Sequence, residues 1–355
     1  MRIDSIITKK LSFPIKPLTT HLRTYNHLNG LICYIYTKTG LYGTSFLYGI
    51  GNTSIEEIVQ HINNLKNKII EKSAANSLAR WKQFWADEFT LQSTAETFAL
   101  AAVDIAVWDL FAKSAQKSLS CLLSSDPATQ IPVYGTTGWL SLSKEELINE
   151  CKKYASLGIN GFKIRLGTNH DYERVAAVRN AMDSNYRIML DANERYSYEE
   201  AKNIITSMAD LNICWIEEPL KTHSKDYALL KRNSPIPVAV GENIFTAKEF
   251  KVACNSKLAD ILQPDVMRCG GITGFINIAT TAQKHQLPLC NHLLSELSVS
   301  LLAAFPNHYL LEYEDILPKN IYTNYFPIID GAMTVPAAPG TGVELTLDAI
   351  KEFEI

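Results

Sequence analysis

Between residues 131 and 314 the sequence repeats one pattern, in which short apolar runs alternate with amphipathic segments of roughly ten to fifteen residues. The eight runs read IPVYGTT, GFKIRLG, YRIMLDAN, CWIEEPL, PVAVGEN, ADILQPDV, LPLCNHL and HYLLEYE. Such alternation is typical of βα units around a parallel sheet. Eight units in succession favour a closed barrel over an open doubly wound sheet. We therefore expect an α/β fold with a (β/α)8-type barrel.

Two other segments flank this barrel region. Residues 1–50 are rich in β-branched and aromatic residues, with breaks that predict strands joined as hairpins. Apolar residues recur at spacings of three and four in residues 54–72 and 94–113, which predicts two helices. The segment from Tyr322 carries several prolines and glycines and is expected to leave the barrel. We predict an α+β capping domain over residues 1–125, a barrel with the candidate site over 126–321, and a segment over 322–355 that packs back on the cap.

Net charge, apolar stretches and cysteine spacing limit which partners the protein is expected to bind and where in the cell it is expected to be. The 355 residues carry a formal net charge of −3, which gives no basic footprint for nucleic acid or anionic lipid. Apolar stretches such as residues 98–107 meet charges well before they could span a bilayer, and the N-terminus lacks the apolar core of a signal peptide. Seven cysteines are scattered without CxxC or Cys/His spacing, which indicates reduced thiols. We expect a cytoplasmic protein that binds neither nucleic acid nor membrane.

A charged or ligand-type residue ends nearly every apolar run after the first. One polar end needs no explanation, because every strand must stop. In a barrel, however, consecutive polar ends direct their side chains into one mouth, where barrel active sites lie. In strand order these residues are Lys163 and Arg165, Asp191, Glu217, Glu242, Asp265, His292 and Glu312.

Asp191, Glu217 and Glu242 end three neighbouring strands. Each alone reads most simply as a surface carboxylate. Together in one cavity they would repel and raise one another's pKa unless a cation lay between them. Oxygen ligands without Cys favour Mg²⁺ over zinc, with Mn²⁺ as a substitute ion. The sequence therefore predicts a Mg²⁺ site.

The remaining strand-end residues suggest what such a metal would assist. A proton alpha to a carboxylate is weakly acidic because its removal gives a dianionic enediolate, and a divalent ion with a cationic side chain such as Lys163 can stabilise that charge. Asp265 and His292 end adjacent strands. The carboxylate could fix the imidazole tautomer and make His292 a general acid/base, although a core histidine capped by an aspartate is the simpler interpretation of that pair alone.

The succession KIR, LDAN, WIEEP, GEN, QPDVMRCGGITG, NHLLSELSVSLLAA and LEYE resembles the enolase superfamily, specifically its mandelate racemase subgroup. The resemblance covers essentially the whole chain, because FALAAVDIAVWDLFAK is similar to the family's cap helix and PGTGVE to its C-terminal tail. It implies a small carboxylate substrate and a homo-oligomer, either a dimer or an octamer. It also implies metal ligands at Asp191, Glu217 and Glu242, a base at His292 positioned by Asp265, an acid at Glu312, a lysine near the substrate carboxylate at Lys163, and a residue near metal and substrate at Asn193.

Arg165 departs from the subgroup, whose racemases carry a second lysine there as the base on the opposite face. Arginine has a pKa above ~12 and is a poor base but a good carboxylate clamp. The resemblance therefore favours a single-base reaction on His292, the dehydration of a sugar acid to a 2-keto-3-deoxy acid. A racemase or epimerase of a 2-hydroxy acid is the alternative, and a non-catalytic descendant that binds metal or a carboxylate is the second.

Two other classes of barrel fit the sequence less well. Amidohydrolase barrels carry an HxH motif on the first strand, where this chain has YGTTG. The muconate-lactonising branch expects a lysine at the end of the sixth strand, where this chain has Asp265.

By the same resemblance, substrate specificity comes from two cap loops, here residues 17–27 and 48–53. His21, Arg23 and Tyr25 make the first loop polar, which suits a hydroxylated or diacid substrate, although these side chains could equally face solvent. Thr136 is a candidate hydroxyl near the substrate carboxylate.

Overall fold

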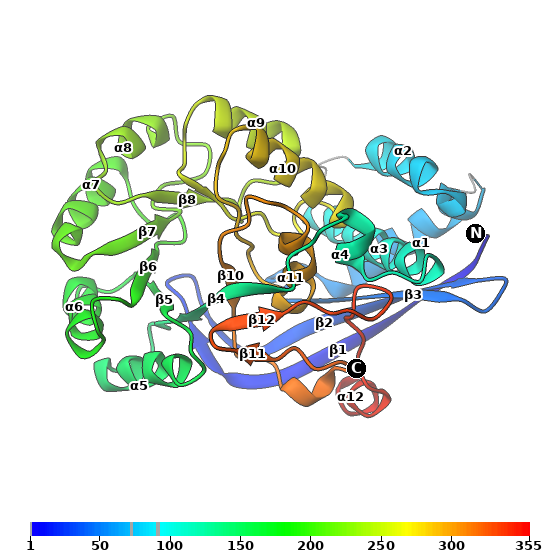
Figure 1. Cartoon of the computed structure of the whole chain (residues 1–355), viewed down its shortest axis with the longest axis horizontal. Coiled ribbons are helices and arrows are strands. Elements are labelled where there is room, and N and C mark those ends of the chain that lie inside the picture. The colour runs from blue at the N-terminus through cyan, green and yellow to red at the C-terminus, as the bar shows by residue number, and fades with distance from the viewer. Residues whose placement is uncertain (1, 72–73, 90–92) are drawn as a thin grey trace.

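The computed structural model describes residues 2–71, 74–89 and 93–355. A barrel of parallel strands with helices outside it makes up the larger part, and a smaller unit of strands and helices lies at one side (Figure 1). The expected (β/α)8-type barrel with an N-terminal α+β unit is confirmed. No helix among these residues is both long and apolar enough to cross a membrane.

The small unit begins with an antiparallel sheet in the order β1-β2-β3. Its β-branched and aromatic residues suit a pleated surface that is buried on one face. The turn between β2 and β3 contains Gly40 at φ +83°, a left-handed conformation that glycine adopts without strain. The strands are β1 (Ile3–Thr19), β2 (Thr24–Thr37) and β3 (Tyr42–Tyr48).

Helix α3 (Thr94–Ser114) is the buried core of this unit. It is apolar on almost every face because it packs against β3, α1 and α10 at once. Ser93 caps its first turn by accepting a hydrogen bond from the Glu96 N–H. The other elements here are α1 (Ile55–Glu71), η1 (Ala74–Asn76), α2 (Leu78–Glu88) and α4 (Leu119–Leu123).

Two buried aspartates on α3 tie the small unit to the rest of the chain. Asp104 accepts hydrogen bonds from Trp81 Nε1 at 2.7 Å, from the Thr273 N–H at 2.9 Å and from Thr273 Oγ1 at 2.6 Å. Thr273 is in the first turn of α10 (Ile272–Lys284), which has no side-chain cap of its own, so Asp104 caps it from another element. Asp109 accepts from the Thr44 N–H and from the Thr341 N–H.

Replacing Asp104 with alanine should lower the free energy of unfolding by about 3 kcal/mol or more, because several buried donors lose their acceptor at about 1–3 kcal/mol each. Urea unfolding of the variant checks this as a lower midpoint. Asp126→Ala removes an exposed aspartate and should leave the midpoint unchanged. An unchanged midpoint for Asp104→Ala would contradict the assigned role.

The barrel strands pair in parallel in the order β4-β5-β6-β7-β8-β9, and β10 pairs with β4 to close the ring. The strands are β4 (Gln130–Thr137), β5 (Gly161–Arg165), β6 (Arg187–Asp191), β7 (Ile213–Glu217), β8 (Val238–Val240), β9 (Ile261–Leu262) and β10 (Leu311–Tyr313). The helices and turns between them are α5 (Lys144–Ala155), α6 (Asp171–Ala181), α7 (Tyr198–Ser207), η2 (Ala209–Leu211), α8 (Tyr227–Asn233), α9 (Ala247–Asn255), α10 and α11 (Ser295–Ala303).

The seventh apolar run, LPLCNHL, was expected to be a strand and is not one in the structure. It makes only isolated bridges, from Leu289 to Leu262 and to His308 and from His292 to Asp265. Pro288 has no N–H to donate to a ladder, which limits regular pairing at the start of the run. The run still occupies the seventh position and brings His292 beside Asp265.

The last part of the chain contacts both units. The strands β11 (Ile328–Ile329) and β12 (Ala332–Thr334) extend the barrel sheet, because β12 pairs antiparallel with β4. The helix α12 (Leu347–Phe353) packs on β1, with the Phe353 ring 4.7 Å from that of Phe13. A short turn, η3 (Lys319–Ile321), precedes these elements. The domain bounds 1–125, 126–321 and 322–355 stay a prediction.

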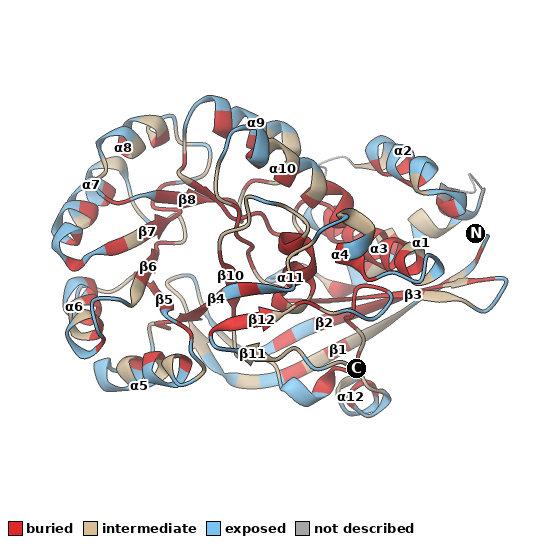
Figure 2. Cartoon of the chain, in the orientation of Figure 1, coloured by how far each residue is buried: buried red, intermediate tan, exposed pale blue. Residues whose placement is uncertain are grey.

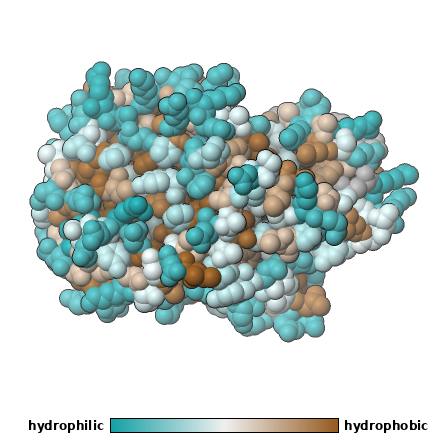
Figure 3. Space-filling model, viewed as in Figure 1, coloured by the Kyte–Doolittle hydropathy of each residue, from teal (hydrophilic) through white to brown (hydrophobic). Residues whose placement is uncertain are grey.

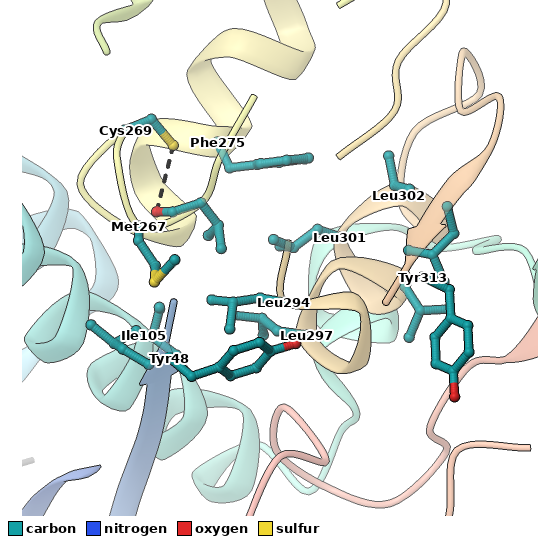
Figure 4. Close-up of a cluster of buried hydrophobic side chains, with 14 of the residues drawn as sticks. Tyr48, Ile105, Met267, Cys269, Phe275, Leu294, Leu297, Leu301, Leu302 and Tyr313 are labelled. Carbon is teal, nitrogen blue, oxygen red and sulfur yellow. Dashed lines mark hydrogen bonds between the residues drawn. The ribbon is translucent and has the colours of Figure 1, made fainter. Parts of the chain in front are cut away.

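Burial follows the layers. The barrel strands and α3 are buried, while the outer faces of the surrounding helices are exposed (Figure 2). The face seen in Figure 3 is largely hydrophilic, with apolar residues interspersed among the polar ones. Figure 4 shows apolar side chains where the small unit meets the barrel: Tyr48 and Ile105 lie near residues of the sixth and seventh βα units, including Met267, Leu294 and Leu297. This packing sets the small unit's loops over the barrel mouth.

Candidate active site

The residues that end the barrel strands lie together at one mouth. The parallel register sets Arg165 opposite Asp191, and Asp191 opposite Glu217. The strands that carry them are buried along almost their whole length, so their positions are fixed by core packing. Rigid strand ends suit a site in which charged groups must be held at defined distances.

Lys163 is fully buried at the centre of this group. Its Nζ lies 2.5 Å from Glu312 Oε1, 2.9 Å from Glu217 Oε2 and 3.8 Å from Asp191 Oδ2. Burial acts to lower the pKa of Lys163, but the surrounding carboxylates outweigh it and raise the pKa well above its ordinary value. Lys163 is therefore a permanent cation at the barrel floor.

Each of the three predicted metal ligands pairs with a different side-chain cation. The pairs are Asp191 Oδ2 with Arg165 Nη1 at 2.6 Å, Glu217 Oε2 with Lys163 Nζ at 2.9 Å, and Glu242 Oε2 with His292 Nε2 at 2.6 Å. Within the described residues, no group of three or more His, Cys, Asp or Glu side chains lies close enough together to hold a metal ion. The carboxylates thus face cations rather than one another.

The donor set nevertheless fits a hard divalent cation. Burial raises the pKa of Glu217 to about 8; Lys163 opposes this rise, and the charges of Asp191 and Glu312 reinforce it. Lys163 therefore does not cancel the combined effect of burial and of the neighbouring carboxylates on Glu217. Carboxylate oxygens from three adjacent strand ends are ligands that Mg²⁺ prefers, and a divalent ion would compete for them with the side-chain cations.

His292 and Asp265 form the expected hydrogen-bonded pair. The Nδ1 atom of His292 lies 2.7 Å from Asp265 Oδ2. The other carboxylate oxygen accepts from the Met267 N–H at 2.7 Å and from the Arg268 N–H at 3.1 Å, so the carboxylate is fixed in orientation. With Nδ1 directed at Asp265, Nε2 is the atom of His292 that faces the pocket.

Arg165 is held from several sides. Its Nη1 contacts Asp191 and donates to Asn193 Oδ1 at 2.9 Å, its Nη2 lies 3.6 Å from Glu314 Oε1, and its Cζ lies 4.4 Å from the centre of the Trp139 ring. Burial acts to lower the pKa of Arg165, but Asp191 and Glu314 outweigh it and raise that pKa further. Its buried Nε has no hydrogen-bond partner among the described residues.

Glu312 is ionised, and both of its carboxylate oxygens have partners. It accepts from Thr136 Oγ1 at 2.6 Å and from the Leu293 N–H at 3.0 Å, besides its contact with Lys163. Burial acts to raise the pKa of Glu312, but Lys163 and His292 lower it to about 2. The structure therefore places the predicted Thr136 against Glu312, one layer below the pocket.

A pocket of about 250 Å³ opens above these residues, between the barrel mouth and the loops of the small unit. The cap loops line it through Arg23 and Tyr25, while His21 lies in an adjoining surface hollow with Thr168 and Arg195. Of the predicted barrel residues, those in the pocket wall are Arg165, Asn193, Glu242 and His292. Those buried beneath it are Lys163, Asp191, Glu217, Asp265, Glu312 and Thr136.

Sequence reasoning missed several residues of this region, among them Glu314 and Arg174. Glu314 lines the pocket, and its spacing of two from Glu312 along a strand was a usable signal, because alternate strand residues share a face. Arg174 on α6 is buried and donates to the carbonyls of Gly138, Trp139 and Arg165 at 3.1, 3.1 and 3.3 Å. It holds together the segments that carry Trp139 and Arg165, and no sequence pattern pointed to it.

Comparisons with known proteins agree with this architecture. The model of the enolase C-terminal domain-like family matches residues 146–349, and that of the mandelate racemase / muconate lactonizing enzyme N-terminal domain matches residues 3–124. Among curated proteins, L-talarate/galactarate dehydratase from Salmonella typhimurium is 28% identical, over 98% of this chain and 90% of that protein. Arabinonate dehydratase from Saccharolobus solfataricus is also 28% identical, over 88% of this chain and 87% of that protein.

The fold comparison gives the same result. The crystal structure of L-talarate dehydratase from Polaromonas sp. JS666, complexed with Mg and L-glucarate, matches with a TM-score of 0.90 and 29% identity, over 100% of this chain and 97% of that one. The predicted resemblance is therefore confirmed, and the chain belongs to the mandelate racemase/muconate lactonizing enzyme family of the enolase superfamily.

Proposed function

We propose that the protein is an enzyme that removes the proton alpha to the carboxylate of a sugar acid and then expels water, giving a 2-keto-3-deoxy acid. The feature that most strongly supports this reaction is the pair of Asp265 and His292. His292 shares the pocket wall with Glu242, and Asp191 and Glu217 are buried beneath that wall. Relatives named as dehydratases of talarate or galactarate, of arabinonate and of gluconate support the choice of substrate class.

In this proposal Asp191, Glu217 and Glu242 hold Mg²⁺. When bound, Mg²⁺ supplies Lewis-acid stabilisation of the negative charge that develops on the substrate carboxylate. Lys163 adds a fixed positive charge at the barrel floor. Glu312 lies beneath the pocket in contact with Lys163 and Thr136, and the role of an acid that the resemblance gives it stays a prediction. Asn193 lies between Arg165 and Glu242 and contributes an amide at the pocket edge.

His292 moves the protons. Its neutral Nε2 accepts the alpha proton and leaves an enediolate; the imidazolium then donates that proton to the β-hydroxyl as the carbon–oxygen bond breaks. The resulting enol loses its hydroxyl proton to water and takes up a proton from water at the β-carbon, which gives the 2-keto acid. Burial lowers the pKa of His292, while Glu242 and Asp265 raise it well above its ordinary value. Mg²⁺ bound by Glu242 would compete with His292 for that carboxylate, and the charge of Glu242 is the largest cause of this rise.

Arg165 explains the preference for dehydration over racemisation. A racemase needs a second base on the opposite face of the alpha carbon, and a guanidinium that is paired with Asp191 stays protonated. One base that removes the alpha proton and returns it to a leaving hydroxyl on the same face gives syn elimination.

The test is incubation with Mg²⁺ in D₂O against a library of sugar acids and 2-hydroxy acids, followed by proton NMR and semicarbazide trapping. We expect a 2-keto-3-deoxy product from at least one sugar acid. Exchange at the alpha carbon with inversion, and without any keto acid, would instead identify a racemase or epimerase. Binding of Mg²⁺ without exchange or turnover of any acid would favour a non-catalytic descendant.

Two further properties stay predictions. A dimer or octamer is expected from the family, and analytical ultracentrifugation of the purified chain tests it. A cytoplasmic location is expected because all seven cysteines are free thiols in the structure and fit a reducing compartment.

A further inference from the structure

Four arginine and lysine side chains line the pocket, and three of them are already paired. Arg165 contacts Asp191, Lys221 Nζ lies 3.6 Å from Glu194 Oε2, and Arg268 Nε lies 3.7 Å from Asp265 Oδ2. The fourth is Arg23. Among the described residues it has no ion pair and no side-chain hydrogen bond; its guanidinium Cζ lies 4.7 Å from the centre of the Tyr25 ring.

Hydrogen bonds hold the backbone of Arg23 in place, although no anionic group of the described residues pairs with its side chain. It lies in the tight turn between β1 and β2, where the Thr20 N–H donates to the Arg23 carbonyl at 2.9 Å and the Arg23 N–H donates to Thr20 Oγ1 at 3.3 Å. The side chain reaches toward the second cap loop, where a Cβ on Gly51 would lie 3.7 Å from Arg23 Nη2. Arg23 is thus a positioned cation at the cap end of the pocket.

The three acidic groups in the pocket wall each contact another basic side chain rather than Arg23. Glu194 accepts from the Thr222 N–H and Oγ1 at 2.5 Å and faces Lys221, Glu242 pairs with His292, and Glu314 faces Arg165. A half-buried guanidinium that lines a binding pocket without a protein anion has the geometry and charge to bind a ligand carboxylate in bidentate fashion.

We propose that Arg23 binds a second carboxylate of the substrate, so that the substrate is an aldaric acid, a sugar diacid, rather than an aldonic acid. This inference rests on the proposed function, in which the first carboxylate is held at the barrel floor and the remainder of the chain extends toward the cap. The relatives do not decide the point, because they act on both diacids and monoacids. Tyr25 supports the guanidinium by a cation–π contact and leaves its donors free.

The test measures turnover of aldaric acids and of aldonic acids of the same configuration by the Mg²⁺-loaded enzyme. The same measurement is made on the variants Arg23→Met and Arg23→Lys. Arg80→Met, which changes an exposed arginine on α2, is the control. We expect the unmodified enzyme to prefer a diacid. Arg23→Met should lower kcat/KM for that diacid by about 10- to 100-fold, the value of one charge-assisted contact, and mainly through KM. It should leave aldonic acids almost unchanged. Arg23→Lys should recover part of the loss, and Arg80→Met should behave like the unmodified enzyme.

Several outcomes would overturn the assignment. Equal or better turnover of aldonic acids, or an equal loss for both classes in Arg23→Met, would rule out a carboxylate contact. Preference for an aldonic acid with a terminal phosphate would assign the cation to a phosphate instead. If no acid is turned over, the proposed dehydration fails, but the midpoint of thermal unfolding still tests Arg23. The midpoint is measured for the unmodified protein and for Arg23→Met, each with diacids and with monoacids. A rise that only diacids cause and that Arg23→Met loses supports the carboxylate contact, and the absence of such a rise refutes it.

Discussion

Replacing His292 with asparagine should lower kcat by about 10²- to 10⁴-fold, the contribution expected of a general acid/base, and should abolish exchange of the alpha proton as well. Both effects follow because one imidazole serves as base for the carbon and as acid for the leaving hydroxyl. Asparagine keeps a polar side chain of similar reach but cannot accept and return a proton. Turnover and solvent-deuterium exchange, measured on the same samples by NMR, check the two effects together.

A matched variant separates catalysis from folding. His285→Asn changes an exposed histidine at the end of α10 and should keep full activity. The His292→Asn protein should still be stabilised against heat by Mg²⁺ and by substrate, since binding increases apparent stability whether or not chemistry follows. Retained alpha-proton exchange with lost dehydration would mean that another group removes the proton and that His292 acts only as the acid.

The barrel could be predicted because its repeat is local. Each βα unit can be recognised from its own sequence, as a short apolar run followed by an amphipathic segment. Parallel strands are buried on both faces, so only a few α/β folds can accommodate them. The seventh run shows the limit: LPLCNHL has strand composition, but Pro288 and the two-residue strand β9 beside it leave only isolated bridges. The composition of a run predicts whether it is buried, whereas its regular pairing as a strand depends on neighbouring strands that are distant in sequence.

The site could be predicted only as far as strand ends determine it. Asp265 and His292 were expected to meet and do lie 2.7 Å apart, because an isolated parallel bridge joins their backbones. The pairing of Arg165 with Asp191, Trp139 and Glu314 depends on side-chain directions that the sequence does not encode locally. His21 shows the same limit for loops: it shares a turn with Arg23 but lies in a different hollow.

Removing divalent cations with a chelator should reduce turnover to the detection limit, and added Mg²⁺ or Mn²⁺ should restore it. The reason is electrostatic: abstraction of the alpha proton gives a dianion, and the Lys163 cation is already matched by Glu217 and Glu312. A metal-depleted sample titrated with Mg²⁺ should therefore show turnover that saturates. The midpoint of thermal unfolding should rise over the same concentration range, because a cation that binds only the folded protein stabilises it.

Glu217→Gln tests where that cation binds. The variant keeps the shape of the side chain but loses one of three negative charges, so it should require a higher Mg²⁺ concentration for both stabilisation and turnover. Glu173→Gln, on the exposed side of α6, should match the unmodified enzyme. Full activity after exhaustive chelation would mean that Lys163 and Arg165 alone stabilise the anion, in which case the three carboxylates serve only as partners for these cations. A Mg²⁺ response that Glu217→Gln leaves unchanged would place the cation elsewhere, since a ligand of this charge cannot be removed from the site without weakening its affinity for Mg²⁺.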